Sequence, residues 1–310
     1  MELRRLRLLH ELARRGTIAA AADALSYSPS SVSVQLAELE REAGVKLLRR
    51  VGRNVELTPA GSRLAEHAAQ ALAADEDIRA QLASLSDAPR GELRMTFVQT
   101  PALALLPATL AALSEAAPDL EVHIIQRETA PAIDELRSRA VDLVVGVEYE
   151  PLPVARHRDV DRLDLVDEDV LLAVPAEPGT TRRDPLSLAR FEHAAWAAGH
   201  PETGHSRLIG HVCNRLGGYA PDIRHRTDDA IILSALVASG RAVTLLPALA
   251  AGAAPGVSLR PIRGMSIRRT IFSACRSSAT QAPAVTAARS ALAEAAKTAA
   301  TGRRDVALTP

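Results

Sequence analysis

The chain has 310 residues, of which 47% are hydrophobic, 24% charged and only 2% aromatic. This balance excludes a largely disordered protein, indicates cores built from Ala, Leu and Val, and at this length favours two or three domains. The 37 basic residues equal the 37 acidic ones, so the formal net charge is zero, which excludes a uniformly basic nucleic-acid-binding protein but allows a local basic region.

The chain shows no sign of export or membrane insertion. Its two cysteines, Cys213 and Cys275, cannot build a disulfide framework, and a reducing cytosol fits them. Residues 1–15 alternate Arg with Leu and lack the apolar run and cleavage site of a signal peptide. No stretch of about 18 residues is both apolar and uncharged. We therefore expect a soluble, cytoplasmic protein without a membrane partner.

The first 65 residues are locally basic and helical. They contain eleven basic and seven acidic residues, a net charge of +4, which predicts that this end meets a polyanion. Apolar spacing predicts a helix ended by Gly16, and Thr17 reads as the N-cap of a short second helix over 18–25. Ser28 caps a third helix with Pro29 at its first position. Helix, tight turn and helix is the arrangement that enters a DNA major groove.

A basic hairpin and a long helix follow. Residues 45–58 place Arg49, Arg50 and Arg53 around Gly52 between apolar residues, which predicts a two-stranded wing with a basic tip. Thr58 and Pro59 then begin a helix that runs to about Ser86 and extends roughly 40 Å at 1.5 Å per residue. This exceeds what a small domain needs for its own core.

The long helix has an a/d-like repeat of apolar residues, which two packing arrangements would explain. A coiled-coil seam between two copies is favoured about two to one over an amphipathic helix that lies on its own domain. The repeat comprises Leu64, Ala68, Ala71, Asp75, Ile78, Leu82 and Leu85, with Asp75 as its polar member.

From Gly91 onward the sequence alternates predicted strands and helices, which is typical of a sheet covered by helices on both faces. The first cycle comprises strand 93–98, helix 102–116, strand 120–126, helix 130–138 and strand 141–147. The second comprises strands 169–175 and 194–197, helix 208–216, strand 223–226, helix 229–239 and strand 242–246. A last strand at 268–275, an Ala-rich helix at 282–300 and a loose tail at 301–310 complete the prediction.

At this point a family pattern is recognisable. The runs GTIAAAADAL (16–25), SPSSVSVQL (28–36), LE (39–40), GVKLL (44–48) and LTPAG (57–61) resemble the winged helix-turn-helix of LysR-type transcriptional regulators. The order of elements after residue 60, and the Gly-rich strand that ends in Pro at 240–247, are also similar to that family.

The resemblance implies a domain organisation and partners. It implies a winged helix-turn-helix domain (1–59), a linker helix for dimerisation (60–88) and an α/β effector-binding domain (91–300) like a periplasmic binding protein. The first of its two subdomains would comprise 91–165 and 267–300, the second 166–266. The protein would bind double-stranded promoter DNA as a dimer or tetramer and hold a small-molecule effector between the subdomains.

The third helix and the wing supply the predicted DNA contacts. The apolar stripe of the helix faces inward, which leaves small hydroxyls and Val34 outward, while the wing arginines suit phosphates or the minor groove. The family usually has a basic residue at Val34 and Gln at Pro29, so direct base readout is expected to be modest. Alternatives are simple capping by Ser28 and Pro29 and a solvated basic loop. The predicted contacts are Thr17, Ser28, Pro29, Ser30, Ser31, Ser33, Val34, Arg49, Arg50 and Arg53.

Ligands of such sheets sit at the carboxyl ends of strands. Thr100 and Thr129 coincide with hydroxyls that family members use to hold a carboxylate, although simple helix capping is an equal alternative. Glu148, with Glu128 near it, predicts a preference for a cationic or amine-bearing effector. The scattered histidines are expected on the surface and not at a metal. The predicted effector contacts are Thr100, Pro101, Thr129, Val147, Glu148, Gly199, His200, Thr203 and Thr227.

An enzyme and a solute-binding protein are the two alternatives to this interpretation. No nucleophile elbow, Walker loop, dinucleotide fingerprint or paired carboxylates support an enzyme, and no cofactor is expected. A cytoplasmic solute-binding protein fits the α/β half alone, but the helix-turn-helix disfavours it.

Overall fold

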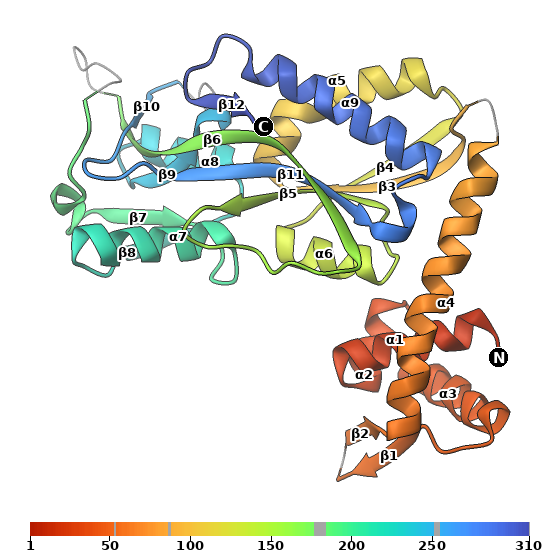
Figure 1. Cartoon of the computed structure of the whole chain (residues 1–310). Coiled ribbons are helices and arrows are strands. Elements are labelled where there is room, and N and C mark those ends of the chain that lie inside the picture. Colours follow the sequence, from red (N-terminus) through yellow and green to blue (C-terminus); the bar gives the residue numbers. More distant parts are fainter. Residues whose placement is uncertain (53, 86–87, 177–183, 251–254, 310) are drawn as a thin grey trace.

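The computed structural model describes residues 1–52, 54–85, 88–176, 184–250 and 255–309. Figure 1 shows a small N-terminal head joined by the long helix α4 to an elongated α/β domain. Arg53 of the predicted wing lies outside the described residues.

The head is a three-helix unit whose ends are capped as the sequence predicts. The side chain of Thr17 accepts a hydrogen bond from the N–H of Ala20 at 3.1 Å, and Ser28 accepts one from Ser31 at 3.2 Å. Gly16 ends the first helix with a φ of 76°, a conformation that costs glycine little. The helices are α1 (Leu3–Arg15), α2 (Ile18–Ala24) and α3 (Pro29–Ala43), and the stripe of Val32, Leu36 and Leu39 is buried as predicted.

The predicted wing is an antiparallel hairpin of β1 (Leu48–Val51) and β2 (Asn54–Leu57). Glu40 of α3 fastens it, because its Oε1 accepts the backbone N–H groups of Leu47 and Leu48 at 2.9 and 3.0 Å. Gly61 lets the next helix approach, since a Cβ there would lie 2.1 Å from the carbonyl oxygen of Leu47.

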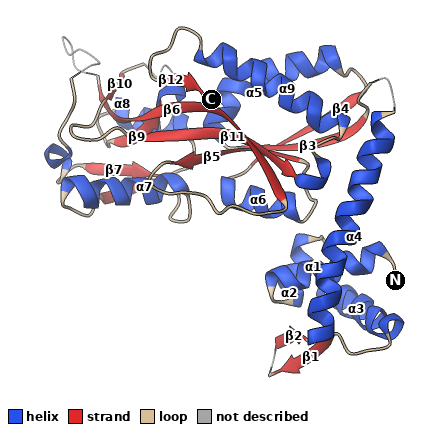
Figure 2. Cartoon of the chain, viewed as in Figure 1, coloured by secondary structure: helices blue, strands red, loops and turns tan. Residues whose placement is uncertain are grey.

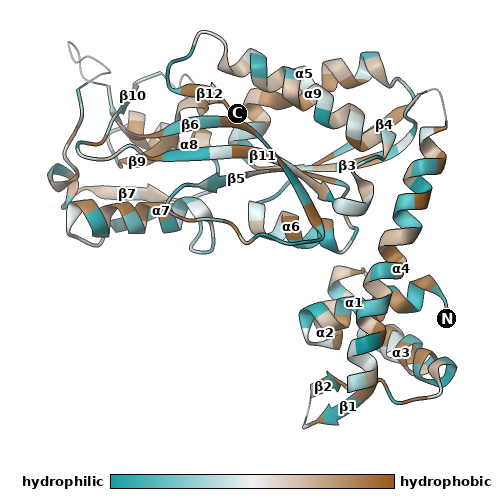
Figure 3. Ribbon diagram, in the orientation of Figure 1, coloured by the Kyte–Doolittle hydropathy of each residue, from teal (hydrophilic) through white to brown (hydrophobic). Residues whose placement is uncertain are grey.

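The two halves of helix α4 (Pro59–Ser84) differ in how far their apolar residues are covered by the rest of the chain. Its first half packs on the head, where Ala65 and Ala68 are 5% and 0% exposed. In the second half Ile78, Leu82 and Leu85 are 48%, 61% and 82% exposed. Figure 3 shows hydrophobic residues between hydrophilic ones along the distal half of α4. The helix therefore serves its own domain first and leaves a hydrophobic stripe uncovered afterwards.

The sheet of the α/β domain begins with three parallel strands in the order β5-β3-β4, as the βαβαβ pattern predicts. Helices α5 and α9 lie on one face of this part of the sheet and α6 on the other (Figures 1 and 2). The elements are β3 (Gly91–Phe97), α5 (Gln99–Ala116), β4 (Leu120–Gln126), α6 (Thr129–Arg137), β5 (Leu143–Tyr149) and α9 (Pro283–Ala300).

Two long antiparallel strands, β6 (Val160–Pro175) and β11 (Arg268–Arg276), connect the halves of the domain. The strand predicted at 169–175 is the second half of β6, so a subdomain boundary at 165 falls inside a continuous strand. The many charged residues at 161–169 hide this strand in the sequence. The second half of β6 pairs with β9 (Thr244–Pro247) and with β10 (Val257–Arg260), which was not predicted.

The far half of the domain adds the parallel pair of β7 and β8 with two helices. The predicted helix 208–216 begins and ends earlier, because Thr203 caps it and a π-turn over Cys213–Gly217 terminates it. The elements are β7 (Ala195–Ala198), α7 (Gly204–Val212), β8 (Asp222–Arg226) and α8 (Ala230–Ala238), with 3-10 turns at Leu188–Phe191, Ala248–Ala250 and Ser277–Ala279.

The expectation of a loose tail is wrong. Residues Val306–Leu308 form β12, which pairs antiparallel with β6 at positions 166–168. Val306 is 4% exposed and joins the main core. Burial of this side chain and the strand hydrogen bonds together hold a segment whose composition alone indicates mobility.

Head and α/β domain touch through ion pairs. Glu76 of α4 accepts from Nε of Arg276 at 2.6 Å and lies 3.6 Å from Arg139. Arg7 of α1 donates to the carbonyl oxygen of Ser138, and Arg14 lies 3.5 Å from Asp134. These contacts place the C-terminal end of α6 against the head.

Replacement of Glu40 by Ala should loosen the wing. Two backbone donors lose their acceptor, so the free energy of unfolding of the head should fall by about 1–3 kcal/mol in denaturant titrations of the purified protein. Burial would raise the pKa of Glu40, but the donors of Leu48, Leu47 and Lys46 outweigh it and keep that pKa below its ordinary value. The stabilisation should therefore be complete at neutral pH and disappear as the pH falls through the lowered pKa.

The matched control is Glu38→Ala on the same helix, where the carboxylate is partly exposed and pairs with Arg41 alone among the described residues. Little change in stability is expected there. Equal losses in the two variants would contradict the role assigned to Glu40.

Candidate functional sites

The first candidate site is the outward face of α3. Val34 is 60% exposed, and Ser30 and Ser33 lie on the same side of the helix. The hydroxyl of Ser33 donates to the carbonyl oxygen of Pro29 at 2.9 Å, and Ser28 caps the helix. Because these hydroxyls already have backbone partners, the face is small and weakly polar. It suits close approach to a surface more than base readout through long polar side chains.

The wing beside this face carries positive charge. Arg49 pairs with Glu56 across the hairpin at 2.9 Å, which partly neutralises it. Arg50 is exposed and has no ion-pair partner among the described residues. Arg50 is therefore more available to a polyanion than Arg49.

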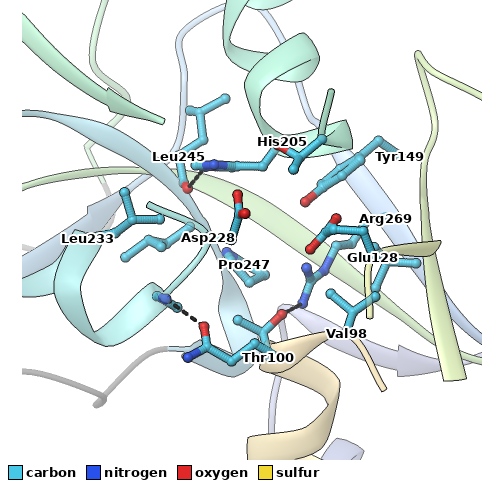
Figure 4. A pocket seen from close by; sticks show the side chains of 15 residues that line it. Val98, Thr100, Glu128, Tyr149, His205, Asp228, Leu233, Leu245, Pro247 and Arg269 are labelled. Atoms are coloured by element: carbon cyan, nitrogen blue, oxygen red, sulfur yellow. Dashed lines mark hydrogen bonds between the residues drawn. The ribbon is translucent and has the colours of Figure 1, made fainter. Parts of the chain in front are cut away.

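The second candidate site is a small cavity between the two halves of the α/β domain, with a free volume of about 50 Å3. Figure 4 shows side chains directed into it from both halves. Its walls come from the ends of β3, β4 and β5 on one side and from α7, α8 and β9 on the other. Apolar lining is given by Val98, Val147, Ala230, Leu233, Leu245, Leu246 and Pro247, and polar lining by Gln99, Thr100, Glu128, Tyr149, Thr203, His205, Asp228 and Arg269.

A buried ion pair forms the floor of the cavity. Arg269 of β11 stands opposite Glu168 of β6. Its Nε donates to Oε1 of Glu168 at 2.8 Å, and its Nη2 lies 2.7 Å from the same oxygen in an ion pair. The second oxygen of Glu168 accepts the N–H of Leu249 at 2.7 Å, and Arg269 also donates to the hydroxyl of Thr100 at 2.7 Å. Burial would lower the pKa of Arg269, but Glu168 outweighs it and raises that pKa. The charged form of Arg269 is therefore favoured, and both partners of the ion pair are hydrogen-bonded.

Gln99 bridges the two walls. Its Oε1 accepts the N–H of Ala230, at the first turn of α8, at 2.6 Å. Its amide also hydrogen-bonds to Asp229, which lowers the pKa of that carboxyl group. Because Gln99 and α8 belong to opposite halves, this contact holds the cavity closed.

His205 is a fixed neutral ring in the wall. Its Nδ1 accepts the N–H of Gly199 at 3.0 Å, so Nε2 carries the proton and donates to the carbonyl oxygen of Leu245 at 2.9 Å. Burial lowers the pKa of His205, which agrees with this tautomer. The prediction of a surface histidine is wrong at this position, because its ring joins α7 to β9.

Two acidic side chains face each other across the cavity (Figure 4). Asp228 accepts from the backbone N–H of His200 at 2.8 Å and contacts its ring at 2.7 Å. The side chain of Glu128 forms no hydrogen bond or ion pair with another described residue. Burial, and then the charge of Asp228, raise the pKa of Glu128 above its ordinary value, against a smaller opposite effect of Arg269. The carboxyl group of Glu128 therefore faces the cavity without a partner among the described residues.

The predicted effector contacts separate into three groups. Thr100, Val147 and Thr203 line the cavity. Thr129 exchanges hydrogen bonds with the N–H and carbonyl of Val147, so its hydroxyl positions α6 on β5. The remaining residues, Pro101, Glu148, Gly199, His200 and Thr227, do not line the cavity.

Glu148 does not face the cavity. It accepts from the N–H of Val154 at 2.7 Å and pairs with Arg156 and Arg162 at 3.1 and 2.6 Å. The alternation of a strand explains this, because Val147 and Tyr149 point into the cavity and the residue between them points away. The acidic cavity residues are Glu128 and Asp228.

Sequence reasoning missed Arg269, Tyr149 and Gln99 as cavity residues. Gln99 adjoins Thr100 at the carboxyl end of a predicted strand, so its position indicated a place in the cavity. Arg269 lies in the last long strand, and no local pattern predicts that this strand inserts between β5 and β6.

Neither a metal centre nor a membrane span is visible in the described part of the chain. No group of three His, Cys, Asp or Glu side chains there is placed to hold a metal ion. No helix in the same ranges combines the length and apolar character needed to cross a bilayer.

Known proteins share both parts of this architecture. Residues 3–62 match the bacterial regulatory helix-turn-helix proteins of the lysR family, and residues 86–297 match the LysR substrate binding domain. The transcriptional dual regulator GltC of Bacillus subtilis is 30% identical over 273 residues, which cover 87% of this chain and 89% of that protein.

Solved structures agree over nearly the full length. A mutant of OxyR from Corynebacterium glutamicum is 26% identical with a TM-score of 0.57, covering 96% of this chain and 93% of that one. Full-length CbnR in complex with its target DNA is 26% identical with a TM-score of 0.51, covering 96% and 100%. The head, linker helix and closed two-walled domain, together with these matches, show that the chain belongs to the LysR family of transcriptional regulators.

Proposed function

We propose that the protein binds promoter DNA as a dimer or tetramer, in the cytoplasm, and that a small effector held in the closed cavity changes this binding. The observation that carries the proposal is the combination, in one chain, of an exposed basic wing and a small cavity joined by α4. No catalytic role is proposed. A solute-binding protein would need neither the helix-turn-helix nor the basic wing. A gel-shift assay with the DNA beside its own gene tests the proposal.

The head has the shape that groove binding requires. The capped N-terminal end of α3 and its small outward face enter the major groove, and Arg50 reaches the backbone beside it. Specificity then comes from contacts of Pro29, Ser30 and Val34 with base edges and thymine methyl groups, and affinity comes largely from phosphates.

A second copy of the chain is proposed to cover the distal stripe of α4. Ile78, Leu82 and Leu85 lie at the a/d-like spacing and are exposed. Pairing of two such helices removes these side chains from water and sets the distance between two heads.

The cavity and the head are connected through α6. Glu128 precedes this helix at the cavity, and the carbonyl oxygens of Leu136 and Ser138 at its other end accept from Arg276 and Arg7. Arg276 also pairs with Glu76 on α4. A shift of the cavity wall on ligand binding therefore reaches both the head and the linker helix.

Arg50→Ala should weaken binding to every duplex sequence tested. Loss of one phosphate contact should flatten the dependence of log affinity on log salt concentration by about 1 per protomer. Fluorescence anisotropy titrations at several salt concentrations measure both quantities. Arg241→Ala, which removes an exposed cation from the α/β domain, is the control and should leave the slope unchanged. A slope in Arg50→Ala equal to that of the wild type would contradict the wing assignment.

Leu82→Glu should dissociate the dimer. The new charge would be buried against its counterpart in the paired helix, where an unpaired carboxylate is costly. Sedimentation velocity should show a smaller species, while Gln70→Glu, on an exposed position of the same helix outside the repeat, should assemble as the wild type does. If Leu82→Glu retains the wild-type assembly, the seam lies elsewhere.

A thiol-based peroxide response is disfavoured, although several relatives are named as hydrogen peroxide-inducible activators. Cys213 and Cys275 are fully buried, and burial raises the pKa of each thiol to about 11. Only roughly one thiol in 10,000 is then ionised at pH 7.

Treatment with hydrogen peroxide should therefore leave DNA affinity unchanged in a gel-shift titration, and Cys213→Ser should behave like the untreated wild type. A loss of affinity that dithiothreitol reverses would show that the buried thiols do react.

A further inference from the structure

The charges of the cavity are unbalanced. Arg269 is the one cation among the described lining residues, and Glu168 beneath it compensates its charge. Glu128 and Asp228 remain, one from each wall. The cavity therefore carries an excess of about two negative charges at neutral pH when both carboxyl groups are ionised.

The two carboxylates are positioned to act together. Glu128 lies where β4 passes into α6, and Asp228 lies just before α8. Their carboxyl groups point toward the centre of the cavity (Figure 4). Asp228 is held by His200, whereas Glu128 has no partner among the described side chains, and its charged form is destabilised both by burial and by Asp228. A positive charge between the two would remove both penalties.

The rest of the cavity lining limits the size of the ligand and favours a ligand that is partly apolar. Leu233, Leu245, Leu246 and Pro247 form one wall, and Val98 faces them. The free volume of the cavity is about 50 Å3, room for only a few water molecules, so it admits only a small ligand. A short hydrocarbon body fits this wall, with its polar group at the carboxylates.

We propose that the cavity binds a small organic cation, an alkylammonium group on a short branched hydrocarbon body, whose N–H groups donate to Glu128 and Asp228 from opposite walls. This inference rests on the proposed function and names the chemical class of its effector. By joining the two walls, the ammonium group reinforces the closure that Gln99 already makes, and it acts on Glu128 at the start of α6.

A simple anion is the main rival, and the geometry opposes it. Arg269 already donates to Glu168 through Nε and to Thr100 through Nη2, and it forms an ion pair with Glu168, so an anion would compete with a buried carboxylate. The same anion would face Glu128 and Asp228 across the cavity. The ammonium group can come from a simple amine or from an amino acid, and the choice of probes distinguishes these sources.

The test uses the full-length protein and three probes with one carbon skeleton: 3-methylbutylamine, 3-methylbutanoate and leucine. Isothermal titration calorimetry and thermal shift measure binding to the wild type. We expect the amine or leucine to bind and the carboxylate not to bind. Glu128→Gln and Asp228→Asn keep the shape of the side chains, and each should lower the affinity for the bound amine at least about tenfold. The control Glu202→Gln, an exposed carboxyl at the rim of a neighbouring cavity, should bind as the wild type does.

Leucine binding without binding of the simple amine identifies an amino acid as the source, provided that Glu128→Gln weakens it. Binding of 3-methylbutanoate alone overturns the proposal, as does binding of neither the amine nor leucine, or an unchanged affinity in folded Glu128→Gln. A parallel gel shift with promoter DNA keeps the two hypotheses apart. DNA binding without amine binding overturns only the effector class, whereas absence of DNA binding overturns the proposed function.

Discussion

The ion pair between Arg269 and Glu168 is the contact on which the geometry of the α/β domain depends. It forms where β6 and β11 run side by side from one half of the domain to the other. Two buried charges are costly to remove from water, and the cost is offset only when every polar atom around them is satisfied. Here Thr100 and the N–H of Leu249 complete the set. The first turn of α5 and the segment after β9 are thereby fixed to the same point, and the cavity walls rise from them.

This arrangement leaves α6 as the element with contacts at both functional ends. Thr129 anchors its first turn to β5, and the carbonyl oxygens at its last turn accept from Arg276 and Arg7. A helix of 9 residues is about 13 Å long and shifts as a rigid unit. Glu76 adds a contact from α4 to the same Arg276. The described contacts between cavity and head therefore run through one short helix and one shared arginine.

Much of the fold could be predicted from the sequence, because its signals are local. N-caps such as Thr17 and Ser28 and the alternation of strands and helices depend on neighbouring residues, and they were confirmed. The extent of β6, the pairing of β12 and the position of Arg269 depend on which distant strands meet, and no local pattern contains that information. Strand alternation could have excluded Glu148, since the apolar residues on either side of it face inward. The absence of a partner for Glu128 becomes visible only once both walls are in place.

The net charge of the chain is zero, but its charges are separated. The wing of the head is basic, whereas the cavity of the α/β domain is acidic. Arg50 projects from the wing without a described counter-ion, while the cavity pairs its one described cation with Glu168 and leaves Glu128 and Asp228 exposed to a ligand. Because electrostatic attraction between exposed charges is screened within about 8 Å at physiological salt, neither end neutralises the other. A polyanion at the head and a cation in the cavity are thus recognised independently, and only the contacts of α6 and α4 allow one to influence the other.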